Sequence, residues 1–285
     1  MSEEYVLIQE ETLTRLADVI RNRIDYTLGS DMYVYYYRII ESLISDRENF
    51  DVYSLPSNIT SIGDHAFCNC EKLTVSSLPS NITSIGEGAF ENCKSLAITS
   101  LPSGLTKISQ YAFGYCDELA LTSLPDSITS IQSGGFINCP KITISELPSG
   151  LTYLGSNVFC YDDELAISSI PDGITRLDYR VFDNCPKITV SKLPSAVTYI
   201  GSYAFRNCDS ITISTIPSTV KTISSQAFSY CENITSMTFE GTPTSLSNSA
   251  FTGCTNLTTI NVPWAEGAVS GAPWGATNAT INYNS

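Results

Sequence analysis

The segment LTVSSLPSNITSIGEGAFENCKS, residues 73–95, is one unit of a repeat that decides the fold. Its pattern returns every 23 residues between Leu55 and Val262, without an insertion or a deletion. A unit of this size cannot bury its apolar face alone and must stack on its neighbours. The repeat therefore predicts an α/β-type solenoid of nine to ten units, built mostly from short strands and turns.

Fixed columns of residues fill the interior of the predicted solenoid. Each unit carries a Phe, and a small residue precedes it in most units, so that large rings and small side chains can interdigitate when the units stack. Pro follows the first apolar column in nearly every unit and removes a backbone donor, which predicts that a short strand ends there.

Ten cysteines invite a disulfide or a zinc interpretation. Most stand three residues after the Phe, and Asp162 replaces the Cys in one unit. Side chains of one column point in parallel, and the only close pair is Cys68 with Cys70, whereas zinc sites usually use short-spaced pairs. We therefore expect reduced, buried cysteines and no metal. Cys160 is not expected to replace the missing column Cys.

The charge of the chain limits its partners. The formal net charge is −14 and the isoelectric point is near 4.4, which argues against nucleic acid and favours cationic or neutral polar partners. No segment is long enough and apolar enough to cross a bilayer, so we expect no membrane insertion.

The two ends differ from the repeat and predict three regions: 1–50, 51–262 and 263–285. Residues 5–9 can form a short strand, and amphipathic helices can begin at Thr12 and Ser30. This helical N-terminal segment could cap the solenoid, or it could attach the protein to another structure or mediate homo-oligomers. Residues 263–285 are expected to cap the other end.

Catalysis has little support. His65 is the only histidine, and it lies close to Asp64 and Cys68, so a Cys–His pair is conceivable. However, His65 belongs to a column that varies between units, as an exposed position would. The sequence favours a non-enzymatic protein with no cofactor.

Variable columns are where a repeat protein can bind a ligand, because the invariant columns are committed to packing. Tyr and Arg anchor interfaces well, and Arg176 could lie between two rings of neighbouring units. An alternative is that the tyrosines only shield the apolar columns. The candidate ligand-binding residues are Tyr153, Arg176, Tyr199, Tyr179, Arg180, Tyr203, Lys107 and Tyr111.

The order Leu, apolar, Pro, apolar, Ile-Gly, Ala-Phe and Cys resembles the BspA-like, or Treponema pallidum-type, leucine-rich repeat over residues 55–262. The resemblance implies a leucine-rich repeat solenoid that binds protein or carbohydrate on a cell surface. One departure concerns the apolar residues after Leu, which that family places at offsets three and five. Only the last units follow this spacing. The earlier ones use offsets two and five, as in Leu73, Val75 and Leu78, so a bulged or shifted strand is expected there.

Both ends resemble tail-associated proteins of phages and prophages of Gram-positive gut bacteria. The matching stretches are YVLIQEETLTRLADVIRNRI, residues 5–24, and VPWAEGAVSGAPWGATNATINYNS, residues 262–285, which holds both Trp residues. The N-terminus shows no secretory signal. These features favour a virion protein made in the bacterial cytoplasm that recognises a bacterial surface. The alternative is a BspA-like adhesin on the bacterial cell surface that binds host proteins.

Overall fold

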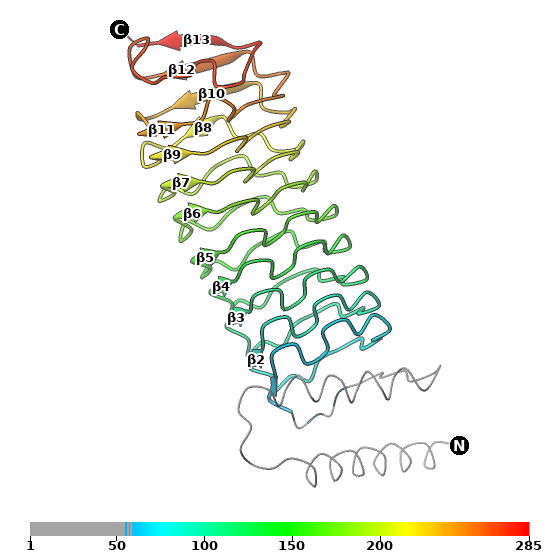
Figure 1. The fold of residues 1–285 in the computed structure, drawn as a ribbon. Helices are drawn as coiled ribbons and strands as arrows, with labels where there is room; N and C mark the ends of the chain where they lie inside the picture. Colours follow the sequence, from blue (N-terminus) through cyan, green and yellow to red (C-terminus); the bar gives the residue numbers. More distant parts are fainter. Residues whose placement is uncertain (1–54, 56, 58, 285) are drawn as a thin grey trace, which may run out of the picture.

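The computed structural model describes residues 55, 57 and 59–284. These residues form a single stack of similar coils (Figure 1). The described part contains short strands and turns and no helix, so the predicted solenoid is confirmed. The predicted N-terminal helices and most of the first region lie outside the described residues.

One series of two-residue strands follows the Pro of each unit. In each strand the second residue is a buried Ile or Leu and the first residue faces outward. Neighbours pair in parallel with a register of 23 residues, as Ser61 with Ser84 and Tyr199 with Thr222. The strands are β1 (Ser61–Ile62), β2 (Ser84–Ile85), β3 (Lys107–Ile108), β4 (Ser130–Ile131), β5 (Tyr153–Leu154), β6 (Arg176–Leu177), β7 (Tyr199–Ile200), β9 (Thr222–Ile223) and β11 (Ser245–Leu246).

This ladder is divided into three sheets. The orders are β1-β2, β3-β4-β5 and β11-β9-β7-β6, so pairing is interrupted between β2 and β3 and again between β5 and β6. Tyr153 and Arg176, the outward residues of β5 and β6, therefore belong to different sheets.

A second series of strands forms only near the C-terminal end. It comprises β8 (Thr215–Ile216), β10 (Ser236–Phe239), β12 (Thr259–Val262) and β13 (Thr280–Tyr283), which make one parallel sheet in the order β13-β12-β10-β8. In β10, Met237 and Phe239 are buried on alternate positions, as a strand requires.

The expected strand before Pro is wrong for the first units, where the structure has no strand. In those units two residues separate Val75 from Leu78, whereas strand alternation allows one. The shifted spacing predicted from the sequence therefore abolishes the ladder there. Single backbone bonds replace it, such as Ala120 N–H to the carbonyl of Ile98 at 3.2 Å.

The core is a stack of phenylalanines flanked by thiols. Consecutive Phe rings from Phe67 to Phe251 lie 5.2 to 5.9 Å apart and nearly parallel. The ten cysteines, all of them in the described part, form no disulfide, and nine are buried. In seven units the column thiol donates to a Phe carbonyl of the preceding turn, as Cys139 Sγ does to Phe113 at 2.9 Å. Burial raises the pKa of the Cys139 thiol, which keeps it a donor.

Two residues of nearly every turn adopt the left-handed backbone conformation. One column runs from His65 to Gln226, and the other runs from Asn69 to Gly253. Asn and Gly, which adopt this conformation at the lowest cost, fill many of these positions. The variable His65 column is therefore a set of tight corners that present side chains outward.

The C-terminal segment continues the stack. β13 pairs with β12, and the Trp274 carbonyl accepts from Phe251 N–H at 2.9 Å. Trp264 and Trp274 pack against each other and against Phe239. The predicted cap function of residues 263–285 stays a prediction. No helix within the described residues is long and apolar enough to span a membrane.

Candidate functional site

The outward residues of β3, β5, β6 and β7 include four of the sequence-predicted site residues. The Arg176 guanidinium lies 4.1 Å from the centre of the Tyr199 ring and pairs with Asp178 at 3.0 Å. Tyr153 is 42% exposed, and among the described residues it makes no ring contact with Arg176. Arg176 thus stacks on one ring and not between two, because the ladder is interrupted between β5 and β6.

A denser cluster forms at the corner after these strands, from Tyr179, Arg180, Tyr203 and Arg206; we call it the tyrosine–arginine cluster. The Arg180 guanidinium lies 5.1 Å from the Tyr179 ring and 5.2 Å from the Tyr203 ring. Arg206 lies 4.7 Å from the Tyr203 ring. The two rings meet edge to face at 5.9 Å. Cation–π contacts of this kind contribute about 0.5–2 kcal/mol each, more where water is excluded.

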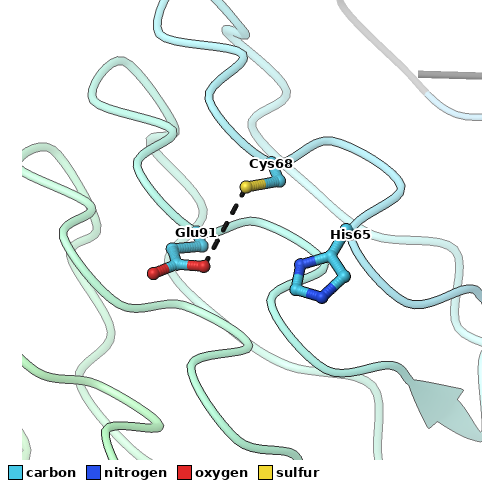
Figure 2. A group of neighbouring side chains, drawn as sticks. All are labelled: His65, Cys68 and Glu91. Atoms are coloured by element: carbon cyan, nitrogen blue, oxygen red, sulfur yellow. Dashed lines mark hydrogen bonds between the residues drawn. The ribbon is translucent and has the colours of Figure 1, made fainter. Parts of the chain in front are cut away.

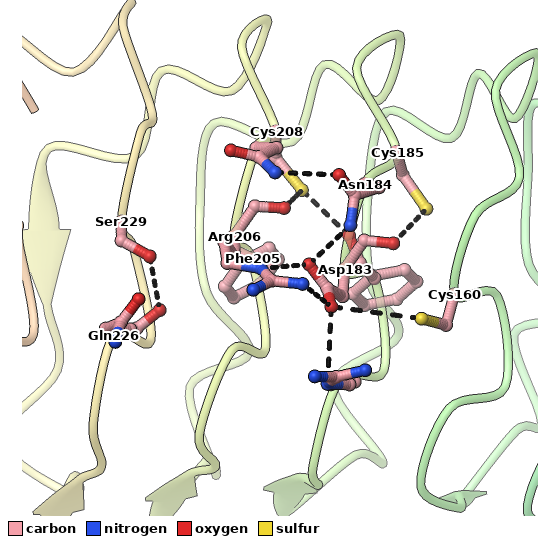
Figure 3. Close-up of polar contacts among 12 residues, drawn as sticks. Cys160, Asp183, Asn184, Cys185, Phe205, Arg206, Cys208, Gln226 and Ser229 are labelled. Atoms are coloured by element: carbon pink, nitrogen blue, oxygen red, sulfur yellow. Dashed lines mark hydrogen bonds and ion pairs between the residues drawn. The ribbon is translucent and has the colours of Figure 1, made fainter. Parts of the chain in front are cut away.

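Asp183 anchors this cluster from inside the protein (Figure 3). Its carboxylate is fully buried and accepts two bonds of 2.7 Å from the Arg206 guanidinium. Arg180 forms an ion pair with it at 3.5 Å, and Asn184 donates to it at 2.9 Å. The hydrogen bonds to this carboxylate raise the pKa of Arg206. Both guanidinium groups are thereby fixed before any ligand arrives.

Lys107 and Tyr111 lie apart from this cluster. Lys107 is the exposed first residue of β3. Tyr111 lies flat on the next turn, where a Cβ on Gly134 would approach its ring to 2.3 Å. Tyr111 therefore needs glycine beneath it, which favours the shielding role for this tyrosine.

The sequence interpretation missed a set of exposed tyrosines in the second left-handed column. Tyr115, Tyr161 and Tyr230 are 39%, 42% and 49% exposed. Tyr230 borders a shallow hollow of about 380 Å³ with an acidic rim. The hollow is lined by Asp163, Asn184, Pro186, Asn207, Asp209, Tyr230 and Glu232. The alternation of Asn and Tyr in this column was the available signal, and the hollow suits a cationic group.

His65 and Cys68 do come together at the first corners, and they are joined by Glu91 of the next turn (Figure 2). Asp64 does not join them, because its carboxylate accepts from Glu87 N–H at 2.8 Å. The sequence interpretation missed Glu91, although it stands 23 residues after Cys68 in the same column.

The family of the chain follows from its repeats. A model of the BspA type Leucine rich repeat region matches residues 39–166 and 154–267. No curated protein matches the chain. The fold is consistent with a binding or adhesion protein, since leucine-rich repeat solenoids typically serve as non-enzymatic binding scaffolds.

Solved structures of bacterial repeat proteins are similar to the chain. The T. pallidum leucine-rich repeat protein is 30% identical over 55% of this chain and 76% of its own, with a TM-score of 0.48. The pneumococcal vaccine antigen PcpA is 16% identical over 81% of this chain and 68% of its own, with a TM-score of 0.50. A leucine-rich cell surface protein of Faecalibacterium prausnitzii is 22% identical over 82% of this chain and 88% of its own, with a TM-score of 0.44. Since the family model covers most of the solenoid, the chain belongs to the BspA-type leucine-rich repeat family.

Proposed function

We propose that this chain is a non-enzymatic binding protein that recognises a protein or carbohydrate on a bacterial or host surface through the tyrosine–arginine cluster. The observation that carries the proposal is the arrangement of Arg180 and Arg206, stacked on tyrosine rings and fixed by the buried Asp183.

Preorganisation is the physical reason. Binding normally costs about 0.5–1.5 kcal/mol for each long side chain that becomes ordered, and an arginine already held by a carboxylate avoids most of that cost. Tyr179 is 42% exposed and offers an aromatic face beside these cations. Such a surface suits an acidic or aromatic protein group, or the face of a sugar ring.

Two biological settings fit this proposal. The family match favours a BspA-like adhesin on the bacterial cell surface that binds host proteins. The resemblance of both termini to phage and prophage tail-associated proteins favours a virion protein that recognises a bacterial surface. In either setting residues 1–50 are proposed to cap the solenoid, to attach it or to mediate homo-oligomers.

The experiment is a binding screen of the full chain against bacterial cells, a glycan array and extracellular host proteins. Tyr179→Ala combined with Arg180→Ala removes one ring and one cation of the cluster. Tyr115→Ala combined with Lys94→Ala removes the same groups elsewhere on the solenoid and serves as the matched control. We expect the cluster variant to lose at least about tenfold in affinity, as interface hot spots do, and the control to bind like the unchanged protein.

Equal binding by the cluster variant and the unchanged protein would reject the cluster as the binding surface. The two settings are separated by antibodies against the chain, applied to intact cells of its source and to phage particles induced from them. Labelling of cells alone supports the adhesin, and labelling of particles alone supports the tail protein.

A further inference from the structure

Three side chains with different donor atoms converge at the first described corners (Figure 2). One donor atom each from His65, Cys68 and Glu91 lies within 4.8 Å of the others, and Cys68 Sγ lies 3.9 Å from a carboxylate oxygen of Glu91. His65 is exposed, and the other two residues are half-buried. An ion could therefore reach the group from solvent.

The two turns that carry these residues are joined rigidly. The backbone N–H groups of residues 65, 67 and 69 donate to the carbonyls of residues 87, 89 and 91, at 2.7, 2.8 and 2.7 Å. Both donor-bearing turns are thus fixed before any ion binds, which is what a precise site requires.

The space beneath the imidazole depends on a glycine. Gly88 is buried and left-handed, and a Cβ on it would lie 2.3 Å from His65 Nδ1 and 3.2 Å from Glu91. In the equivalent column other turns carry Tyr111, Asn157 or Arg180. Only a residue without a side chain lets His65 and Glu91 approach each other at this corner.

Cys68 has an outer hydrogen-bond partner of the kind that supports a metal-bound thiolate. Asn69 Nδ2 lies 3.4 Å from Cys68 Sγ, and the Asn69 carbonyl oxygen in turn accepts from Asn92 Nδ2 at 2.9 Å. Asn92 thereby directs the Asn69 NH₂ group toward the sulfur. Outer-shell contacts of this type orient ligands and tune metal affinity.

The charge of the Glu91 carboxylate also calls for a cation. Among the described residues, no lysine or arginine forms an ion pair with Glu91. The overall charge of −14 adds a general attraction for positive ions.

We propose that His65, Cys68 and Glu91 form a binding site for a divalent transition metal ion of the zinc class. Imidazole, thiolate and carboxylate are the ligands that Zn²⁺ accepts, and three protein ligands leave a fourth position for water. A tetrahedral ion with bonds of about 2.3 Å to sulfur and about 2.0 Å to oxygen holds these two atoms about 3.5 Å apart. The sulfur and oxygen atoms need to approach by only a few tenths of an ångström from their distance of 3.9 Å.

The test is titration of the full, reduced chain with ZnCl₂ by calorimetry, and with CoCl₂ by absorption spectroscopy. We expect one equivalent of Zn²⁺ to bind and Co²⁺ to give a thiolate-to-metal absorption band. His65→Ala, Cys68→Ser and Glu91→Gln should each weaken binding more than about tenfold, since even outer-shell changes cost about 10- to 100-fold. Cys68→Ser should also abolish the band.

Gly88→Arg offers an independent test, because its side chain would displace the imidazole and supply a fixed cation. It should weaken Zn²⁺ binding as much as His65→Ala does. Matched controls are Cys160→Ser, Asn157→Ala and Glu118→Gln, which should leave binding unchanged, and circular dichroism without metal checks that every variant is folded.

Two results would overturn the proposal. One is a chain that binds no Zn²⁺. The other is binding that survives Cys68→Ser and His65→Ala, because the ion would then be held elsewhere.

Discussion

Two corners of this solenoid, four turns apart, begin from the same pair of groups and differ in what surrounds it. Cys68 faces Glu91 across one layer and Cys160 faces Asp183 across another, each with sulfur 3.9 Å from a carboxylate oxygen. Around Asp183 stand Arg180 and Arg206. The equivalent positions around Glu91 are Gly88 and Gly114, and His65 stands where the central corner has Asn157.

The difference shows that a carboxylate in this stack can be neutralised in two ways. At the central corner the chain supplies two guanidinium groups, which allows Asp183 to be fully buried. At the first corner glycines leave space, and His65 and Cys68 add donor atoms. The first arrangement prepares a binding surface of arginine and tyrosine, and the second matches a site for a metal cation.

The sharpest contrast between the two corners is expected in thiol reactivity. Burial, together with the charge of Asp183, raises the pKa of the Cys160 thiol to about 12. At pH 8 its thiolate population is then roughly a thousandfold below that of an ordinary cysteine. Cys68 is half-buried and has access to solvent, so we expect iodoacetamide to label Cys68 long before Cys160.

Peptide mass spectrometry over a time course measures both labelling rates, and the chain unfolded in guanidinium provides the control in which all ten cysteines react. Labelling of Cys160 as fast as Cys68 would contradict the difference in environment. Added ZnCl₂ should slow the labelling of Cys68 and leave that of Cys160 unchanged.

A change of Arg206 to Ala tests the central corner by stability. It removes the two 2.7 Å bonds to a fully buried carboxylate, and breaking a buried pair of this kind costs about 3–5 kcal/mol. Lys141→Ala, which breaks the exposed ion pair with Glu118, should cost less than about 1 kcal/mol. Urea unfolding of both variants measures the difference, and equal losses would mean that Asp183 does not depend on Arg206.

Asp162 gives a smaller, pH-dependent effect. It takes the place of the column cysteine near the central corner, whereas the first corner keeps Cys70. Burial raises the pKa of the Asp162 carboxyl well above its usual value, so the folded state holds a proton that the unfolded state releases above about pH 4. The unchanged protein should therefore lose stability as the pH rises from 4, by at most about 1.4 kcal/mol per pH unit.

Asp162→Cys removes this cost and should stabilise the protein more at pH 7 than at pH 4. Thermal unfolding at the two pH values measures the effect. Asp163→Ser, a change of the exposed neighbouring carboxylate, serves as the control and should show no such trend. A stabilisation that is equal at both pH values would mean that Asp162 stays ionised in the folded state.

Much of this fold could be predicted from residues alone. The Phe column, the reduced cysteines and the position of Asp162 in the thiol column follow from spacing, and the structure confirms them. The shifted spacing of Leu73, Val75 and Leu78 signalled a departure, but it did not reveal that the strand would be missing altogether. Alternation of side chains is lost there, and hydrogen bonding between turns depends on the backbone that results.

The candidate sites were predictable in part. The sequence singled out Arg176, Arg180 and Tyr203, yet it did not show that Arg206 and Asp183 complete the central cluster. Both of those residues stand in the same column as Cys68 and Glu91, which the repeat arithmetic could have aligned. Alignment alone, however, does not tell which neighbours turn toward each other.

The sequence by itself determined the period of the stack and the identity of its inner columns, because the covalent spacing of 23 residues places the same residue types on top of one another in every turn. Only the tertiary structure decided which outer side chains meet. Those contacts depend on the left-handed corners, which turn residues such as His65 and Arg180 outward, and on interruptions of the ladder such as that between β5 and β6. Both features arise from packing between turns, which no single unit contains.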